Sequence, residues 1–295
     1  MGQFLLFSVG TGLMWAILAI GIYLAFRILD VADMTAEGAY PLGAAVSAVA
    51  ILSGFPAWLG AVFGFMAGLL AGYVTGFLQT KMKIPGLIAG ILSMTALYSI
   101  NLRIMGQANL SLLGEETLSK QLATWQIPTA WVPLVIGGVA IVLVISILVG
   151  FMYTELGLNL RATGDNPTMA EANGIPVERM KRVGLAISSG CTSLAGALLS
   201  QTNGYADISM GTGVLVIGLA AIFIAEVLFQ NLTFGQRLVT IALGAVIYRV
   251  LIDLLMRQEL IVIEPSDVKL LSAIALVLIL WLPSYLKQHQ LKKGV

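Results

Sequence analysis

Residues 131–153, WVPLVIGGVAIVLVISILVGFMY, contain no charged side chain and are apolar almost throughout. A helix of about 20 apolar residues crosses the roughly 30 Å hydrocarbon core of a bilayer, so this stretch predicts a membrane-spanning helix. The whole 295-residue chain follows the same trend, because 58% of it is hydrophobic and 11% is charged. Soluble domains have about 45–50% apolar and about 25% charged residues. This composition predicts an integral membrane protein and excludes disordered, nucleic-acid-binding and secreted disulfide-rich classes.

Eight further apolar stretches flank this segment on both sides, so we expect an all-α, polytopic bundle of about nine spans (8–10) in a single transmembrane domain, 1–295. Residues 27–38 leave an alternative open, because they could form a break inside the membrane rather than a turn between two spans. The nine predicted spans are 4–26, 34–53, 57–79, 85–105, 131–153, 183–201, 211–229, 237–256 and 269–286.

The orientation of the bundle follows from the positions of lysine and arginine, which favour cytoplasmic loops. If the loop 154–182 is cytoplasmic, eleven bases lie inside: Arg27, Lys81, Lys83, Arg161, Arg179, Lys181, Arg182, Arg237, Lys287, Lys292 and Lys293. Four lie outside: Arg103, Lys120, Arg257 and Lys269. This asymmetry predicts an outer N-terminus and an inner C-terminus.

Four ionisable residues fall inside the apolar segments, where a charge must face protein, water or a partner: Glu37, Glu226, Arg249 and Asp253. Arg249 and Asp253 are four residues apart, so they share one helical face and are predicted to form an intramembrane ion pair. Glu226 lies close to the predicted inner interface, where it either reaches cytoplasmic water or takes part in a pathway.

Glu37 lies beside Gly38 and close to Pro41, which weaken a regular helix. One interpretation is a broken helix that lines a cavity or gate. The other is an ordinary helix start, with Thr35 or Asp33 as the N-cap.

Catalytic and metal-binding side chains are scarce. The chain has one cysteine, Cys191, and one histidine, His289, and its net charge is +1. A zinc site or a Cys–His nucleophile pair therefore lacks its components, and no bulk charge attracts nucleic acid. An ion-coupled secondary transporter that uses Glu37, Glu226 or Asp253 remains an alternative function.

A glycine recurs at every fourth position of the third predicted span, from Gly60 to Gly76. Positions four apart form one ridge of a helix, so this span offers a smooth surface to a neighbouring helix. The surface is either tightly packed or a face along which helices slide.

The loop 154–182 is the longest predicted inner loop, and its caps define a short helix over 168–173. Asp165 or Asn166 provides the N-cap, and Pro167 suits the first helical position. Gly174 provides a left-handed C-terminal residue, and Pro176 ends the element. We therefore expect a rigid helix on the cytoplasmic side, suited to docking a partner.

The segments LRATGDNP (160–167) and NGIPVERMK (173–181) closely resemble the coupling-helix loop of ABC importer permeases of the branched-chain amino acid and ribose family. The segments GAYPLGA (38–44), LAGALL (194–199) and MGTG (210–213) are also similar to that family. Two segments depart from its branched-chain members, DMTAEG (33–38) and EVLFQNLTFG (226–235). Both look like a neighbouring subfamily whose binding protein takes tryptophan or another aromatic amino acid.

The resemblance implies a bacterial inner-membrane importer with three kinds of partner besides lipid. These are a second permease copy, forming a homodimer, two cytoplasmic ATP-binding subunits, and an extracellular binding protein. No GxxxxGK[ST] loop occurs, so ATP and magnesium would bind to partner subunits and this chain would bind no cofactor. The residues implied to couple to the ATPase are Asp165, Asn166, Pro167, Ala170, Glu171, Gly174, Ile175 and Pro176; Met34, Thr35, Glu37, Ser93, Thr95 and Asn101 are pathway candidates by location alone.

Overall fold

A computed structural model describes residues 2–124, 127–229 and 232–256, together with the single residues 270, 273, 274 and 277. Within these residues, eight helical segments are long and apolar enough to cross a membrane. The all-α polytopic bundle is therefore confirmed. The predicted ninth span, 269–286, and the predicted inner C-terminus fall outside the described residues, apart from the four single positions.

The eight spans match the predicted stretches to within a few residues at most ends. The sixth begins earlier than expected, at Val177 rather than at residue 183, because the polar turn that precedes the apolar run is already helical. The helices are α1 (Gly2–Tyr23), which continues as the π-helix η1 (Leu24–Ile28), α2 (Thr35–Leu52), α3 (Ala57–Thr80), α4 (Gly86–Met105), α6 (Val132–Met152), α9 (Val177–Asn203), α10 (Val214–Leu228) and α11 (Phe234–Met256).

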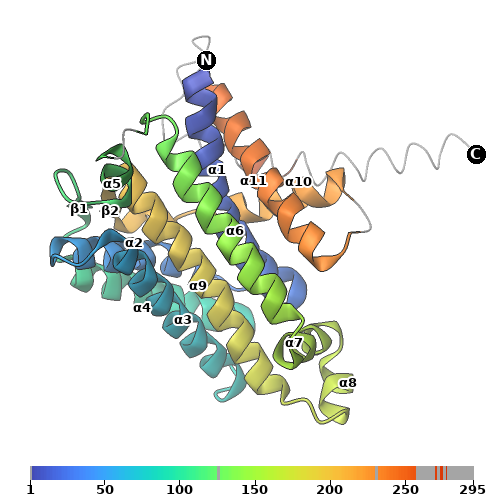
Figure 1. Ribbon diagram of the computed structural model, residues 1–295. Coiled ribbons are helices and arrows are strands. Elements are labelled where there is room, and N and C mark those ends of the chain that lie inside the picture. Colours follow the sequence, from blue (N-terminus) through green and yellow to red (C-terminus); the bar gives the residue numbers. More distant parts are fainter. Residues whose placement is uncertain are drawn as a thin grey trace, which may run out of the picture.

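Shorter elements fill the connections between the spans. They are β1 (Asn109–Ser111), α5 (Leu118–Thr124), α7 (Glu155–Asp165), α8 (Pro167–Ala172), β2 (Tyr205–Asp207) and the 3-10 helix η2 (Ile208–Gly211). The strands β1 and β2 pair antiparallel, with Leu110 opposite Ala206. This small ladder joins two connections that are both predicted to be extracellular, and it lies at the opposite end of α9 from α7 and α8 (Figure 1).

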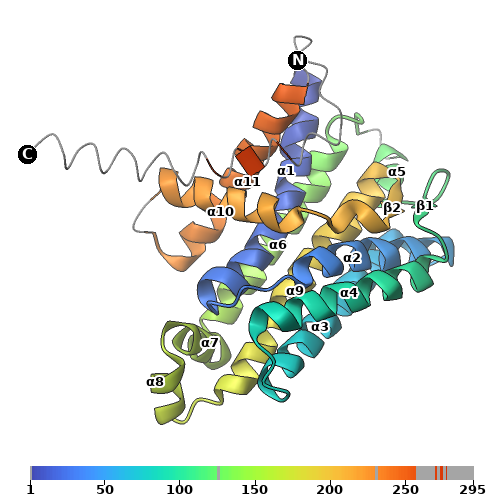
Figure 2. The same ribbon diagram turned by 180° about the vertical axis from the view of Figure 1, so that it is seen from behind.

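Helix α9 occupies the centre of the bundle. It packs against α1, α2 and α3, while α6 and α11 flank α1 and α10 packs against α11. Figure 2 shows the same arrangement from behind, with α2, α3 and α4 forming a group on one side of α9 and α1, α6 and α11 on the other. The main hydrophobic core is built around α1, with buried residues of α6, α9, α10 and α11 packed against it.

The glycine ridge of α3 lies against α9 over most of its length. A Cβ atom at Gly68 would lie 2.3 Å from the Cβ of Ser193, and one at Gly72 would lie 2.2 Å from the carbonyl oxygen of Leu185. The hydroxyl of Ser193 donates to the carbonyl of Gly64 over 2.7 Å. The ridge thus has the geometry of tight packing, the first of the two interpretations.

The connection between α1 and α2 is a short non-helical segment, residues 29–34. Asp33 is buried there, and its carboxylate accepts a hydrogen bond from the backbone N–H of Thr35 over 2.9 Å. Helix α2 then continues through Pro41 without a break. The structure agrees with the helix-start interpretation of this region. The N-cap position is Met34, which makes no side-chain cap, so neither predicted N-cap, Thr35 or Asp33, is correct.

The faces of α3, α4 and α6 that point away from the bundle carry large apolar side chains. Leu70, Val139, Val142 and Ile147 are each more than 60% exposed. An apolar surface of this extent suits lipid or a second copy of the chain rather than water.

Candidate transport and coupling sites

The loop 154–182 forms two capped helices rather than one. The predicted short helix is confirmed as α8, with Asn166 as its N-cap, because the amide oxygen of Asn166 accepts from the N–H of Met169 over 3.0 Å. Asp165 instead ends the preceding helix α7, whose own N-cap is Thr154. The backbone of Gly174 has φ of +80°, the left-handed conformation that its position predicted.

Helix α7 anchors this pair of helices to the bundle. A Cβ atom at Gly164 would lie 1.6 Å from the carbonyl oxygen of Ile28, so the backbones of α7 and η1 are in direct contact. Leu160 is buried against Gly184 of α9. The guanidinium of Arg161 lies 5.8 Å from the ring centre of Phe234 at the start of α11. A displacement of α7 would therefore reach three different spans.

Helix α8 presents most of its residues to solvent. Asn166, Pro167, Met169 and Glu171 are exposed, whereas the side chain of Ala170 is 2% exposed and packs inward. Of the other predicted coupling residues, Asp165, Gly174 and Pro176 are exposed and Ile175 is half-buried. Ala170 thus holds the helix in place from beneath, while its neighbours form the outer surface.

Two ion pairs lie near the end of the bundle that carries α7 and α8. The guanidinium Nε of Arg27 donates to Glu226 over 2.8 Å and joins η1 to α10. Lys81 and Glu178 are 3.3 Å apart and join the end of α3 to the start of α9. The sequence singled out Glu226 but not its partner, which is 199 positions away.

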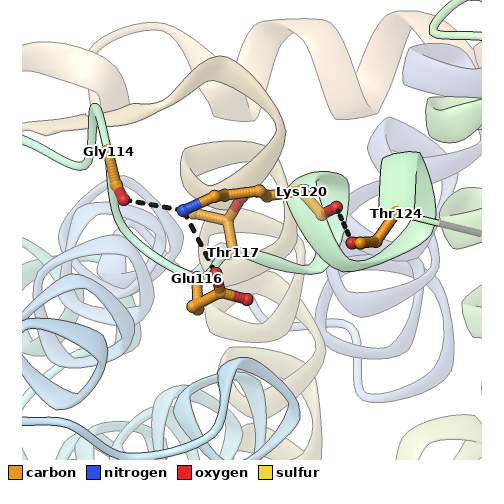
Figure 3. A network of polar contacts seen from close by, with 5 residues as sticks. All are labelled: Gly114, Glu116, Thr117, Lys120 and Thr124. Atoms are coloured by element: carbon orange, nitrogen blue, oxygen red, sulfur yellow. Dashed lines mark hydrogen bonds and ion pairs between the residues drawn. The ribbon is translucent and has the colours of Figure 1, made fainter.

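At the opposite end, the connection between α4 and α6 folds around α5. The ammonium of Lys120 donates to the carbonyl of Gly114 over 2.8 Å and lies 3.1 Å from a carboxylate oxygen of Glu116 (Figure 3). The hydroxyl of Thr124 donates to the carbonyl of Lys120. These contacts give the connection a defined shape on the predicted extracellular side.

The pathway candidates separate into two groups inside the bundle. Thr35 and Ser93 belong to the first, a buried row of hydroxyls completed by Thr75. The hydroxyls of Thr35 and Thr75 are 2.9 Å apart, and Thr75 donates to Ser93 over 2.7 Å. Thr75 was not predicted, and its place between the two other hydroxyls had no signal in the sequence.

The second group lines a cavity of about 350 Å³ between α2, α4 and η2. Glu37, Thr95 and Asn101 were predicted, while Tyr98, Ser209 and Thr212 were missed. The position of Tyr98, three residues before Asn101 on one face of α4, was a signal for it, whereas Ser209 and Thr212 are more than 100 positions away from Asn101 and had none. Met34 lies apart from both groups, in a smaller apolar cavity beside Asp33.

The acids inside the spans all have partners. Arg249 and Asp253 form the predicted ion pair, with 3.0 Å between Nε and a carboxylate oxygen. A carboxylate oxygen of Glu37 accepts from the backbone N–H of Gly213 over 3.1 Å. Among the described residues, no three acidic, histidine or cysteine side chains gather to hold a metal ion.

Two carboxylates outside the spans, those of Asp33 and Asp207, have pKa values shifted from the ordinary value of an aspartate. Burial raises the pKa of Asp33, and this outweighs the hydrogen bonds from Thr35 that lower it. Burial also acts to raise the pKa of Asp207, but hydrogen bonds from Ser209 and Asn109 outweigh it and hold the pKa below its ordinary value.

The fold and the two capped helices α7 and α8 define a polytopic membrane protein with a rigid element at one end. A family model described as the permease component of branched-chain amino acid transport systems matches residues 4–282, so the chain belongs to this family. It is therefore the permease component of an amino acid transport system and not an enzyme. In such a system the ATPase activity sits on a separate subunit.

Two relatives cover most of the chain. The tyrosine transport system permease protein of Clostridioides difficile (strain R20291) is 38% identical over 266 residues, which make up 90% of this chain and 86% of that protein. An uncharacterized protein of Rickettsia prowazekii (strain Madrid E) is 37% identical over 265 residues, 88% of this chain and 90% of that one. The first relative agrees with the predicted resemblance to the aromatic amino acid subfamily.

Among solved structures, PsaBC from Streptococcus pneumoniae in complex with Fab has a similar fold. The TM-score is 0.52, and the match covers 94% of this chain and 90% of that one, at 13% sequence identity. This likeness supports the helical architecture alone.

Proposed function

We propose that this chain is the transmembrane subunit of an ATP-driven ABC importer in a bacterial inner membrane. The observation that carries the proposal is the α7–α8 pair. Helix α8 is capped and exposes most of its residues, while α7 contacts η1 at the end of α1, as well as α9 and the start of α11. An ATPase subunit that moves α8 would pass the movement through α7 to these three spans. Alternating access would follow from their displacement.

The remaining partners follow from the same proposal. Two permease copies form a homodimer, each copy docks one ATPase subunit that binds ATP and magnesium, and an extracellular binding protein delivers the substrate. The surface for the binding protein includes the ordered connection around α5 and the β1–β2 ladder. This chain itself needs no cofactor.

The proposed substrate is an aromatic amino acid, with tyrosine the first candidate. Support comes from the relative named as a tyrosine transport permease and from the two segments that depart from branched-chain members. Specificity also depends on the binding protein, so a panel of amino acids is required.

The test is uptake of radiolabelled tyrosine, tryptophan, phenylalanine and leucine into proteoliposomes that contain the permease and its cognate ATPase, with the binding protein outside. We expect tyrosine uptake to require ATP inside the vesicles and to persist when ionophores collapse sodium and proton gradients. Uptake by the permease alone, driven by an ion gradient, would show that the secondary-transporter interpretation is correct instead.

A further inference from the structure

Three arginines from three different elements gather at the end of the bundle that carries α7 and α8. They are Arg27 in η1, Arg161 in α7 and Arg237 in α11. The backbones of η1 and α7 touch where Gly164 meets the carbonyl of Ile28. Ile28 directly follows Arg27, and Gly164 lies three positions after Arg161 on the same face of α7. The first two arginines are therefore neighbours across this contact.

The start of α11 brings the third arginine to the same place. The guanidinium of Arg161 lies 5.8 Å from the ring centre of Phe234, the first residue of α11. Arg237 is three positions further, so it shares a face of the helix with Phe234. Four charges act on the hydroxyl of Tyr23 in α1, those of the three arginines and that of Glu226. The three arginines thus form one group, called the arginine cluster below.

The arginine cluster has more positive than negative charge. The Nε of Arg27 donates to Glu226 over 2.8 Å, and the carboxylate of Asp30 attracts Arg27 without forming an ion pair. In the part of the chain that the structure describes, neither Arg161 nor Arg237 has a carboxylate within ion-pair distance. Like charges held close together repel each other, and an anion between them removes the repulsion. The cluster therefore favours a negatively charged ligand.

Exposed apolar side chains border the cluster. Val227, Leu228 and Phe229 are exposed directly after Glu226, at the end of α10. Val239 is exposed in the first two turns of α11. Apolar side chains of this kind suit the hydrocarbon of a bilayer, while arginines reach the headgroups beside it. A cytoplasmic ATPase subunit has no acyl chains to cover this apolar border, so a phospholipid fits the surface better.

We propose that the arginine cluster binds the phosphate of an anionic phospholipid, whose acyl chains lie along the exposed apolar side chains of α10 and α11. The planar guanidinium group matches a phosphate with two parallel N–H donors, and basic groups between helices at a membrane surface bind anionic headgroups. A lipid in this position ties α7 to α11. The site depends on neither the transported substrate nor the energy source, so it goes beyond the proposed function.

The first test uses the full-length permease, freed of bound lipid in dodecylmaltoside and titrated with dioleoylphosphatidylglycerol, and native mass spectrometry measures the bound lipid. The comparison ligands are dioleoylphosphatidylcholine, whose choline cancels the phosphate charge, and inorganic phosphate. We expect phosphatidylglycerol to bind saturably and at least about tenfold more tightly than phosphatidylcholine, because each arginine near an anionic lipid strengthens binding about fivefold. Inorganic phosphate should leave the lipid bound. This arm needs no variant.

The second test compares Arg161→Gln and Arg237→Gln, which each remove one cation that lacks an acidic partner. Each should weaken phosphatidylglycerol binding about fivefold and leave phosphatidylcholine binding unchanged. The matched control is Arg179→Gln, because Arg179 is exposed at the start of α9 and belongs to no ion pair within the described chain. The control should bind phosphatidylglycerol like the wild type, and size-exclusion chromatography checks that each variant is folded.

The inference is wrong if the wild type binds both lipids equally well, or if both cluster variants bind phosphatidylglycerol like the wild type. An equal loss in Arg179→Gln would show a general effect of charge and would also overturn the site. Displacement of the lipid by inorganic phosphate would identify free phosphate, not a lipid, as the ligand. The proteoliposome uptake assay tests the proposed function separately, so a failure of the lipid site leaves the importer intact.

Discussion

At the scale of single residues, two acids of the spans, Asp253 and Glu226, are each paired with an arginine. Asp253 is 5% exposed and lies 3.0 Å from Arg249, and Glu226 is paired with Arg27. A carboxylate that already has an arginine beside it is a poor carrier for a coupling ion. This arrangement argues against ion coupling through Glu226 or Asp253.

Removing one member of the Arg249–Asp253 pair should destabilise the protein. Arg249→Leu leaves the buried carboxylate of Asp253 without its cation, which costs about 3–5 kcal/mol. The double variant Arg249→Leu, Asp253→Leu removes both charges and should recover most of the loss. Thermal unfolding of the purified protein measures both effects, and a double variant as unstable as the single one would contradict a pairing role.

The carboxylate of Asp207 should make stability depend on pH in acid. Its pKa is held below the ordinary value of 3.8, so the folded state favours the charged form. The stabilisation is fully present above pH of about 4 and is lost as the pH falls through the lowered folded-state pKa. Unfolding midpoints of wild type and Asp207→Asn should therefore differ at pH 6 and converge at pH 2; a difference that is unchanged over this range would exclude the titration of Asp207.

At the scale of elements, the close approach of α3 and α9 is what makes the bundle compact. This approach depends on the glycines of the α3 ridge, because a Cβ atom at Gly72 would lie 2.2 Å from the carbonyl oxygen of Leu185. Backbone atoms cannot move aside as a flexible side chain can. The spacing of the two helices is therefore set by glycine.

Gly72→Ala should lower stability by about 1–3 kcal/mol, because the added methyl group forces α3 and α9 apart. The matched control is Gly138→Ala in α6, where an added Cβ has no atom within 4 Å. The control should be neutral or slightly stabilising, since alanine is the better helix former. Melting temperatures in detergent test the contrast, and an equal effect of the two substitutions would show that the α3–α9 contact is not tight in the membrane.

At the scale of the whole molecule, the α7–α8 pair lies at one end and η2 and the β1–β2 ladder lie towards the other (Figure 1). Residues of η2 also line the cavity between α2, α4 and η2. Helix α9 runs between the two ends, contacting α7 near its start and β2 at its end. A movement of α8 therefore has a continuous packed route to the cavity.

Substitutions in the α8 segment should uncouple ATP hydrolysis from transport. Gly174→Val strains a backbone with φ of +80°, and Glu171→Lys reverses an exposed charge that would face the ATPase. We expect the variant complexes to assemble and to hydrolyse ATP. The ratio of tyrosine taken up to ATP hydrolysed should fall at least about tenfold, because a displaced docking helix no longer passes the movement of the ATPase to the spans. The assay measures uptake and phosphate release in one proteoliposome preparation, with the exposed Ser146→Ala as control. If both variants had the wild-type ratio of tyrosine uptake to ATP hydrolysis, the coupling role of α8 would be disproved.

Much of the architecture was predictable because its causes are local. Apolar runs bounded by charged residues predicted the eight described spans. The capping residues Asn166, Pro167 and Gly174 predicted α8 to within one residue at each end. Helix α7 was missed even though Thr154 is a good N-cap, because the helix is amphipathic and only 11 residues long. The start of α2 was predicted with the wrong N-cap, because the helix begins after Met34, and neither Asp33 nor Thr35 occupies the N-cap position.

The sequence by itself determined which segments are apolar enough to span a membrane, where α8 is capped, and which family the chain resembles. These properties depend on hydrophobicity and hydrogen bonding within a few neighbouring residues. Only the tertiary structure decided the pairings of Arg27 with Glu226, Glu37 with Gly213 and Asn101 with Gly38, which are 199, 176 and 63 positions apart. The physical reason is that a polar group buried among helices takes whichever partner the packing brings to it, and that packing is set by the whole bundle at once.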